Sequence, residues 1–326
     1  MRDLVIPLVE LDAIQRARQR IVKAVRVTPL VAASSDERWA HLRLKCENLQ
    51  AGGAFKLRGA FNFVSQLDPA VTARGVITYS SGNHGQAVAL AARRLGAPAV
   101  VVMPTTAPAV KVDGARAFGA EVLFAGTTSI DRKLAAEALA SERGLTIVPP
   151  FDHADIIAGQ GTAGLEILDQ QPDVTAVYVP VGGGGLISGV AAAVKRLAPS
   201  VRLVGVEPAG APKMTRSLAA GQPTTLDAID SIADGLLAVR PGDLTFAHVA
   251  ALVDEVVTVT DDEIRDAMRF LVRQSKIVAE PSGAAGVAGA LRMAPEGSRG
   301  VHVAVVSGGN LEMSMLRAIL DDGRPN

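Results

Sequence analysis

The sequence predicts an α/β fold, with open sheets of parallel strands covered by helices on both faces. Short runs rich in β-branched residues alternate with longer alanine-rich segments of helical pattern, which is the order expected of βαβ units. Most of the runs are continuously apolar rather than alternating, as in strands buried on both faces. With 326 residues, the chain is long enough for one large or two medium domains.

The elements follow one another in that alternation along the chain. We expect strands at Gly75–Tyr79, Ala99–Met103, Glu121–Phe124, Thr146–Val148, Ala176–Val181, Leu203–Val206, Val256–Val259 and Val301–Val306. The helical patterns between them lie at Gln86–Leu95, Lys133–Arg143, Gly161–Asp169, Ile187–Leu197 and Asp262–Gln274.

Composition excludes several classes of function. Lys and Arg number 33, as do Asp and Glu, and aromatic residues make up 3%, so we expect no nucleic-acid partner. Cys46 is the only cysteine, which excludes a disulfide framework and a cysteine metal cluster. The uncharged stretch Val174–Val194 contains Pro180 and four glycines, so it predicts a strand, loop and helix rather than a membrane span. The short N-terminal apolar run carries Asp3 and Pro7, and we expect a soluble cytoplasmic protein.

Lys56 is the first candidate functional residue. It follows two glycines, Ala54 and Phe55, just ahead of a segment that we expect to be an amphipathic helix. Phe55 can stack on a flat ring, and Ala54 leaves room beside it. A lysine desolvated against an apolar wall has a lowered pKa and is a competent nucleophile and base.

A glycine run between a predicted strand and a predicted helix is a candidate phosphate site. Its backbone N–H groups can point into one concavity, and the helix N-terminus adds partial positive charge. A dinucleotide fingerprint, with Glu207 as its acid, and a tight turn without a ligand are the alternatives. The run comprises Gly182, Gly183, Gly184, Gly185 and Leu186.

Two further polar runs follow predicted strands. In Ser80-Ser81-Gly82-Asn83-His84, the N–H groups can hold a substrate carboxylate, Asn83 can bond a cofactor oxygen, and Ser81 can carry a proton. Helix capping is the alternative, and we expect a structural role for His84. Ser307, before Gly308-Gly309, can face a pyridine nitrogen and leave it neutral; a strand-end turn is the alternative.

Three of these four runs come directly after predicted strands, ending at Tyr79, Val181 and Val306. Ligands of open α/β sheets bind beyond the carboxyl ends of strands, so we expect the runs to converge. An imine-forming amine, two glycine-rich loops and a hydroxyl together are what a pyridoxal 5'-phosphate (PLP) site requires.

These motifs, in this order, resemble fold type II pyridoxal-phosphate enzymes, which share the fold of the tryptophan synthase β-subunit. Within them the chain is similar to the serine/threonine dehydratase (threonine ammonia-lyase) and serine racemase group, over nearly its whole length. Besides the four runs, the matching motifs are Val27-Thr28-Pro29-Leu30, Pro150-Phe151-Asp152, Ala158-Gly159-Gln160-Gly161-Thr162, Gly205-Val206-Glu207-Pro208, Ile232-Ala233-Asp234-Gly235 and Glu280-Pro281-Ser282-Gly283.

The resemblance implies two lobes, a homodimer and a role for each site residue. Residues 1–67 and 151–326 would form a large cofactor-binding domain, and residues 68–150 a small mobile domain. Lys56 would carry the cofactor and remove the substrate α-proton, Phe55 would pack on the ring, and Asn83 would bond the ring hydroxyl oxygen. The N–H groups of Gly182 through Leu186 would hold the phosphate and Ser307 would face the pyridine nitrogen, while Ser81 matches the position that protonates the opposite face in racemases.

The implied reaction converts a β-hydroxy amino acid of the threonine or serine type to a 2-keto acid and ammonia. It would proceed by α,β-elimination through an aminoacrylate. An amino-acid racemase of the same family and a nicotinamide-dependent oxidoreductase using the glycine run are the alternatives, and a silent amino-acid- or cofactor-binding regulator is a third. Metal-binding relatives place a carboxylate after Glu207, where this chain has Ala211-Pro212-Lys213. We therefore expect no metal site, and an ammonium at Lys213 can stand in for a cation electrostatically.

Overall fold

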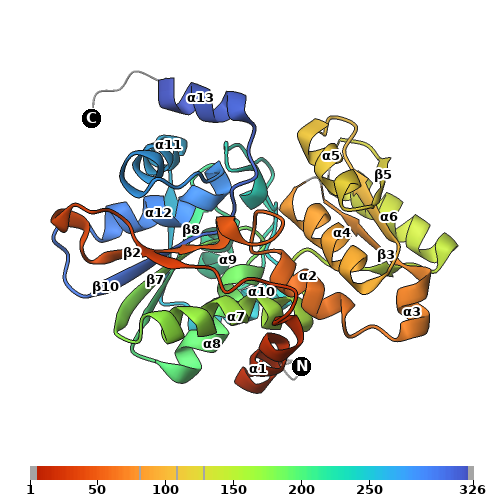
Figure 1. Ribbon diagram of the computed structural model, residues 1–326, viewed down its shortest axis with the longest axis horizontal. Coiled ribbons are helices and arrows are strands. Elements are labelled where there is room, and N and C mark those ends of the chain that lie inside the picture. Colours follow the sequence, from red (N-terminus) through yellow and green to blue (C-terminus); the bar gives the residue numbers. More distant parts are fainter. Residues whose placement is uncertain (1–5, 81, 108, 128, 322–326) are drawn as a thin grey trace.

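Two sheets, one large and one small, form the framework of the protein. The computed structural model describes residues 6–80, 82–107, 109–127 and 129–321 (Figure 1). The large sheet has the strand order β1-β2-β10-β7-β8-β9 and the small sheet the order β5-β4-β3-β6. All pairs are parallel except β1 with β2. The predicted α/β fold with helices on both faces is confirmed.

Every predicted strand forms, with ends that shift by at most two residues. In the large sheet the strands are β1 (Leu30–Ala32), β2 (Leu42–Cys46), β7 (Val174–Pro180), β8 (Arg202–Pro208), β9 (Glu255–Val259) and β10 (Val301–Val306). In the small sheet they are β3 (Val76–Tyr79), β4 (Ala99–Met103), β5 (Glu121–Phe124) and β6 (Thr146–Ile147). β1 and β2 were not predicted, and β2 lies inside the large sheet between β1 and β10.

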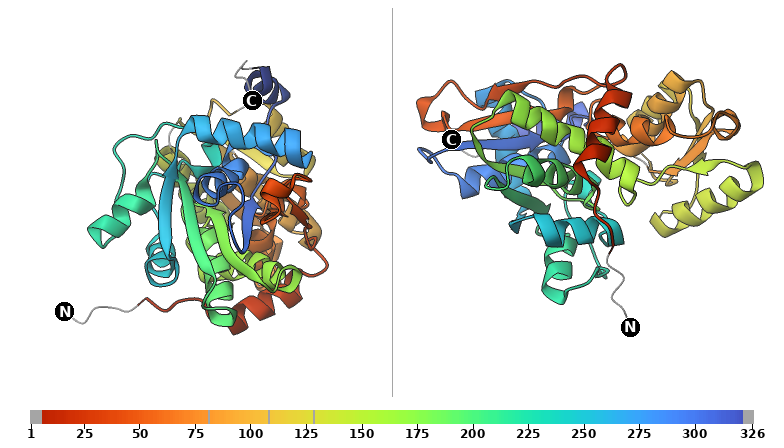
Figure 2. Two further views of the ribbon diagram at one scale, coloured as in Figure 1. Left: turned by 90° about the vertical axis from the view of Figure 1, so that its left-hand side faces the viewer. Right: turned by 90° about the horizontal axis from the view of Figure 1, so that it is seen from below.

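Helices cover both faces of both sheets. The large sheet packs against α7 (Ala154–Gln170), α8 (Gly185–Leu197) and α10 (Asp243–Leu252) on one face and against α11 (Asp261–Phe270) and α12 (Pro281–Met293) on the other. The small sheet packs against α4 (Asn83–Leu95) and α5 (Ala109–Ala117) on one face and against α6 (Ser129–Arg143) on the other. The remaining helices are α1 (Leu11–Ile21), α2 (Leu57–Val64), α3 (Pro69–Arg74), α9 (Lys213–Ala220) and α13 (Met313–Asp321). Figure 2 shows the small sheet with its helices at one end of the molecule.

The structure tests two predictions about single segments, the uncharged stretch Val174–Val194 and the helix after Lys56. Val174–Val194 folds as β7, the glycine loop and most of α8, as predicted, and no helix in the described ranges is both long and apolar enough to cross a membrane. A helix with one apolar and one polar side follows Lys56, as expected, but all eight residues of α2 are buried, because its polar side chains Arg58 and Asn62 bond to other elements. This helix packs against α4 on the small-sheet side and α7 on the large-sheet side, so it has no face left for solvent.

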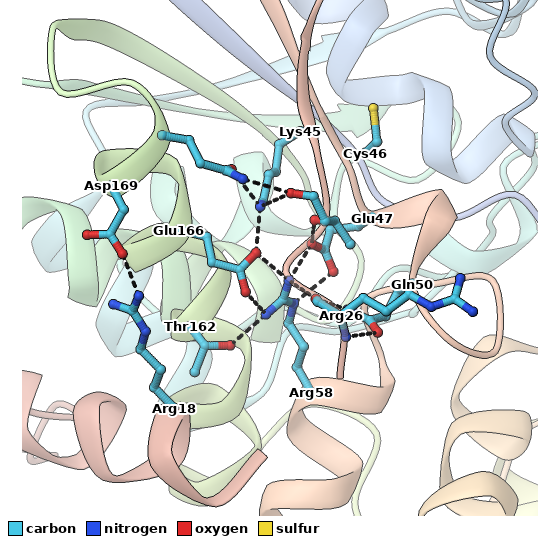
Figure 3. A network of polar contacts seen from close by, with 12 residues as sticks. Arg18, Arg26, Lys45, Cys46, Glu47, Gln50, Arg58, Thr162, Glu166 and Asp169 are labelled. Carbon is cyan, nitrogen blue, oxygen red and sulfur yellow. Dashed lines mark hydrogen bonds and ion pairs between the residues drawn. The ribbon is translucent and has the colours of Figure 1, made fainter. Parts of the chain in front are cut away.

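A buried ion network joins β2, α2 and α7 (Figure 3). Arg58 Nη2 lies 2.7 Å from Glu47 Oε1, and its Nη1 lies 2.7 Å from Glu166 Oε1. Lys45 Nζ lies 2.5 Å from Glu166 Oε2 and also donates to the Thr28 carbonyl at 2.7 Å. These hydrogen bonds fix Arg58 two residues beyond Lys56, so they hold the start of α2 in place.

Candidate active site

A pocket of about 250 Å³ lies between the carboxyl ends of the two sheets. Its walls come from the loops after β3, β7 and β10, from the start of α2, and from the segment around Gly235. The predicted residues that line it are Phe55, Lys56, Ser80, Gly82, Asn83, His84, Gly182, Gly183, Leu186 and Ser307. The four runs therefore converge, as the strand-end argument predicted.

Lys56 presents its amine to this pocket. The Nζ donates to the Pro150 carbonyl at 2.7 Å and lies 5.2 Å from the centroid of the Phe55 ring. Burial lowers the pKa of Lys56 to about 8, since the surrounding protein replaces the water that would stabilise the ammonium. A larger fraction of this amine than of an ordinary lysine is therefore unprotonated and nucleophilic at neutral pH.

The glycine loop runs from the end of β7 into α8. Gly184 has φ +100°, a conformation that side chains rarely adopt. A Cβ on Gly183 would lie 2.4 Å from ring carbons of Phe151, and Thr245 Oγ1 donates to the Gly183 carbonyl at 2.6 Å. The first N–H groups of α8 have no intrahelical acceptor, so the loop can bind an anion. Gly184 caps α8 and Gly185 is its first residue, and neither is among the residues that line the pocket.

Asn83 begins α4 and bonds residues on the opposite wall of the pocket. Its Nδ2 donates to Glu280 Oε1 at 2.5 Å, and its Oδ1 accepts from Asn310 Nδ2 at 2.9 Å. Asn310 Nδ2 also donates to the Gly52 carbonyl at 2.8 Å. The amide of Asn83 is thus oriented by partners on both sides.

Glu280 is buried beside this amide. Burial raises the pKa of Glu280 to about 8, and the negative charge of Asp234 adds to the shift. The hydrogen bond from Asn83 and the charge of Lys111 oppose the shift only in part. The pocket therefore contains a carboxyl group that is largely protonated at neutral pH, able to donate a hydrogen bond.

His84 and Ser307 are the other predicted side chains in the wall. His84 is 3% exposed, its Nε2 lies 3.1 Å from the Val148 carbonyl, and burial lowers its pKa to about 3, with Lys56 adding to the shift. A neutral imidazole bonded to the backbone fits the structural role expected for it. Ser307 is 4% exposed, its Oγ lies 3.4 Å from the Ser282 carbonyl, and its own carbonyl accepts from Phe55 N at 3.1 Å. Ser81, the predicted proton carrier, lies outside the described residues.

Four charged residues in the wall escaped the sequence analysis as functional candidates. Lys111 is ion-paired with Asp234, whereas Arg132 has a buried Nε without a hydrogen-bond partner in the described structure. Asp234 and Glu280 belong to motifs quoted for the resemblance, and their positions directly before Gly235 and Pro281 were the signal available. Lys111 and Arg132 stand in ordinary helical sequence, where nothing distinguishes them from surface charges.

The residues present fit PLP. An amine with a lowered pKa, a glycine loop whose backbone can approach an anion, and a partly apolar slot beside Phe55 are brought together in one pocket. This set defines the class of enzymes that hold an aldehyde cofactor by a lysine and its phosphate by backbone N–H groups.

Comparison with known proteins identifies the family. Residues 21–308 match the family model described as pyridoxal-phosphate dependent enzyme. The chain is 42% identical over 318 residues to the L-threonine ammonia-lyase of Thermotoga maritima, covering 97% of this chain and 79% of that protein. It is 41% identical over 308 residues to an L-threo-3-hydroxyaspartate ammonia-lyase of a Pseudomonas species, covering 94% and 96%. The structure of maize serine racemase superposes with a TM-score of 0.90 at 39% identity, covering 97% and 98%.

The chain belongs to the pyridoxal-phosphate-dependent enzymes of fold type II. It is a PLP-dependent carbon–nitrogen lyase of the dehydratase type. The racemase alternative fits the same matches but is not favoured over the lyase, and the nicotinamide interpretation of the glycine loop is not supported.

Proposed function

We propose that the protein converts a β-hydroxy amino acid of the threonine or serine type to a 2-keto acid and ammonia. The observation that carries this proposal is the Lys56 amine, with its pKa lowered to about 8, facing a pocket bounded by the glycine loop and the Ser80–His84 loop. When bound, PLP supplies an electron sink that acidifies the α-hydrogen of the substrate.

The predicted site residues receive the following roles in this proposal. Lys56 holds the cofactor and then accepts the α-proton, Phe55 packs against the ring, and Asn83 donates to the ring oxygen. Ser307 faces the pyridine nitrogen, and the N–H groups of Gly182 through Leu186 bind the phosphate. The substrate carboxylate is held by the loop of Ser80, Ser81, Gly82, Asn83 and His84, with Ser81 as proton carrier. The support for these roles is that the described members converge on one pocket.

Two further proposals concern the lobes and the assembly. We propose that residues 68–150 move as a small lobe over a large lobe of residues 1–67 and 151–326. Such a movement would break the polar contacts that join α4 and α5 to the opposite wall of the pocket, among them Asn83 with Glu280 and Lys111 with Asp234. We also propose that the protein is cytoplasmic and forms a homodimer. The family resemblance supports the dimer, and light scattering of the purified protein tests it.

A second substrate class is favoured by one observation. Arg132 lines the pocket, and its buried Nε has no hydrogen-bond partner among the residues that the structure describes, so a substrate with a second carboxylate would gain a charge-assisted hydrogen bond there. The relative named L-threo-3-hydroxyaspartate ammonia-lyase acts on such a compound.

The experiment measures keto acid and ammonia from the PLP-loaded protein with L-threonine, L-serine and L-threo-3-hydroxyaspartate. Chiral analysis of remaining substrate reports racemisation in the same tubes. Release of both products, abolished by Lys56→Ala, supports the lyase. If Arg132→Met reduces kcat/KM only for hydroxyaspartate, the acidic substrate is favoured, whereas D-enantiomer formation without keto acid would overturn the proposal.

A further inference from the structure

Lys213 is a buried cation that the proposed chemistry does not use. It is the first residue of α9 and its side chain is fully buried. Its Nζ donates to three backbone carbonyls: Val181 at 2.9 Å, Leu236 at 2.8 Å and Ala211 at 3.1 Å. An ammonium has three donors, so these three carbonyls satisfy it completely.

A carboxylate completes the surroundings of this ammonium. Glu207 Oε2 lies 3.5 Å from Nζ, and the carboxylate also accepts from Met214 N at 3.0 Å and Thr215 N at 2.8 Å. Burial lowers the pKa of Lys213 to about 8 although Glu207 opposes the shift, so the amine remains mostly charged at neutral pH. We call the four oxygen-bearing groups, from Val181, Glu207, Ala211 and Leu236, the Lys213 cage.

The Lys213 cage joins the segments that shape the phosphate end of the pocket. Val181 directly precedes Gly182, and Leu236 itself lines the pocket. Met214, the next residue of α9, packs on the glycine loop, since a Cβ on Gly184 would lie 3.1 Å from its Cε. Losing the ammonium would leave three carbonyls and a carboxylate without a cation between two walls of the same pocket.

Oxygen-only donor sets of carbonyls and a carboxylate are those that hard cations prefer. We propose that Lys213 is a built-in cation, a positioning residue that fixes the glycine loop and makes cofactor binding independent of free metal ions. Without the lysine side chain, the cage becomes a site for a free monovalent cation such as ammonium or potassium. This inference rests on the proposed role of the glycine loop as the phosphate site.

The test compares Lys213→Ala with Lys213→Met and the wild type. The PLP dissociation constant is measured from the absorbance of bound cofactor, and the unfolding temperature of the apoprotein is measured in parallel. Both are recorded in chloride salts of ammonium, potassium, magnesium and tetramethylammonium at equal ionic strength. Tetramethylammonium carries the charge but is too bulky for the cage and donates no hydrogen bond.

We expect the wild type to bind PLP equally in all four salts. Lys213→Ala should bind PLP at least about tenfold more weakly in tetramethylammonium, a loss equal to one of its three charge-assisted hydrogen bonds, and recover in ammonium or potassium. Lys213→Met should bind PLP as weakly as Lys213→Ala and should recover in none of the salts, because the methionine side chain fills the Lys213 cage. Lys195→Ala is the matched control: Lys195 bonds two carbonyls and Asp254, away from the pocket, so PLP affinity should stay unchanged.

Each other outcome overturns the inference. Wild-type affinity that rises with added potassium or magnesium would show that the protein uses a free cation. Wild-type affinity in Lys213→Met would show that the cage does not position the loop, and weak binding by Lys213→Ala that no salt restores would leave the lysine a packing residue. If Lys213→Ala does not fold, the PLP affinity of Lys213→Met and the wild-type salt series still test whether Lys213 positions the glycine loop. Failure of the wild type to bind PLP at all would instead overturn the cofactor site itself.

Discussion

Replacing Glu166 with glutamine tests whether the buried ion network is balanced as the structure indicates. Lys45 and Arg58 supply two positive charges, and Glu47 and Glu166 supply two negative ones, with side chains at most 6% exposed. Glu166→Gln leaves one positive charge buried without compensation. Breaking a buried pair in this way costs about 3–5 kcal/mol, because the remaining ion pays its desolvation with nothing to offset it.

A double variant separates charge balance from packing. Lys45→Met leaves one excess negative charge and should cost a similar amount. Lys45→Met with Glu166→Gln leaves only the Arg58–Glu47 pair, which is neutral. We therefore expect the double variant to lose about 2 kcal/mol less than the sum of the two single losses.

The assay is equilibrium urea unfolding of the apoprotein followed by circular dichroism. Asp169→Asn serves as the control, since Asp169 pairs with Arg18 at the surface, where the side chains are 54% and 49% exposed. Figure 3 shows this pair beside the network, and its loss should cost less than about 1 kcal/mol. Strictly additive losses in the double variant would refute the argument from charge balance.

Three further predictions concern the pocket. Burial lowers the pKa of Lys56 to about 8, so PLP uptake by the apoprotein should accelerate about tenfold per pH unit below 8 and level off above it; stopped-flow absorbance that keeps rising to pH 10 would contradict this. Gly183→Ala should weaken PLP binding at least tenfold, because the new Cβ would lie 2.4 Å from the Phe151 ring, and adding Phe151→Leu should restore part of the affinity in the same titration. The pKa of Glu280 is raised from 4.5 to about 8 in the folded state, so the free energy of unfolding of the wild type should decrease as the pH rises from 4.5 to 8. Urea unfolding of Glu280→Gln should lack this part of the pH dependence.

The sequence predicts the strand-end loops well because their signals are local. Continuous apolar runs set the parallel strands, and glycine or serine directly after them marks the pocket edge, as at Val181 and Val306. The strand β2 was missed for the opposite reason. Arg43 and Lys45 interrupt its apolar residues, and the lysine is tolerable in a buried strand because distant groups, Glu166 among them, accept its hydrogen bonds.

The charged part of the pocket depends on residues far apart in the chain. Glu280 meets Asn83 across 197 residues, and Lys111 meets Asp234 across 123. Single charges of this kind look like solvated surface in a sequence, because the neighbours that bury and pair them are supplied only by the tertiary fold. The same holds for Lys213, whose ammonium was expected to replace a cation but whose three carbonyl partners no local pattern reveals.

The strand order has a consequence for how the chain is made. All four strands of the small sheet lie between residues 76 and 147, so that sheet can assemble as soon as this stretch has left the ribosome. The large sheet cannot assemble at that stage, because β10, the last of its strands to be synthesised, inserts between β2 and β7. Until then β2 has no parallel neighbour, and Ser307 is not yet opposite Phe55. Truncated nascent chains that end before residue 301 should therefore contain a folded small sheet but no cofactor pocket.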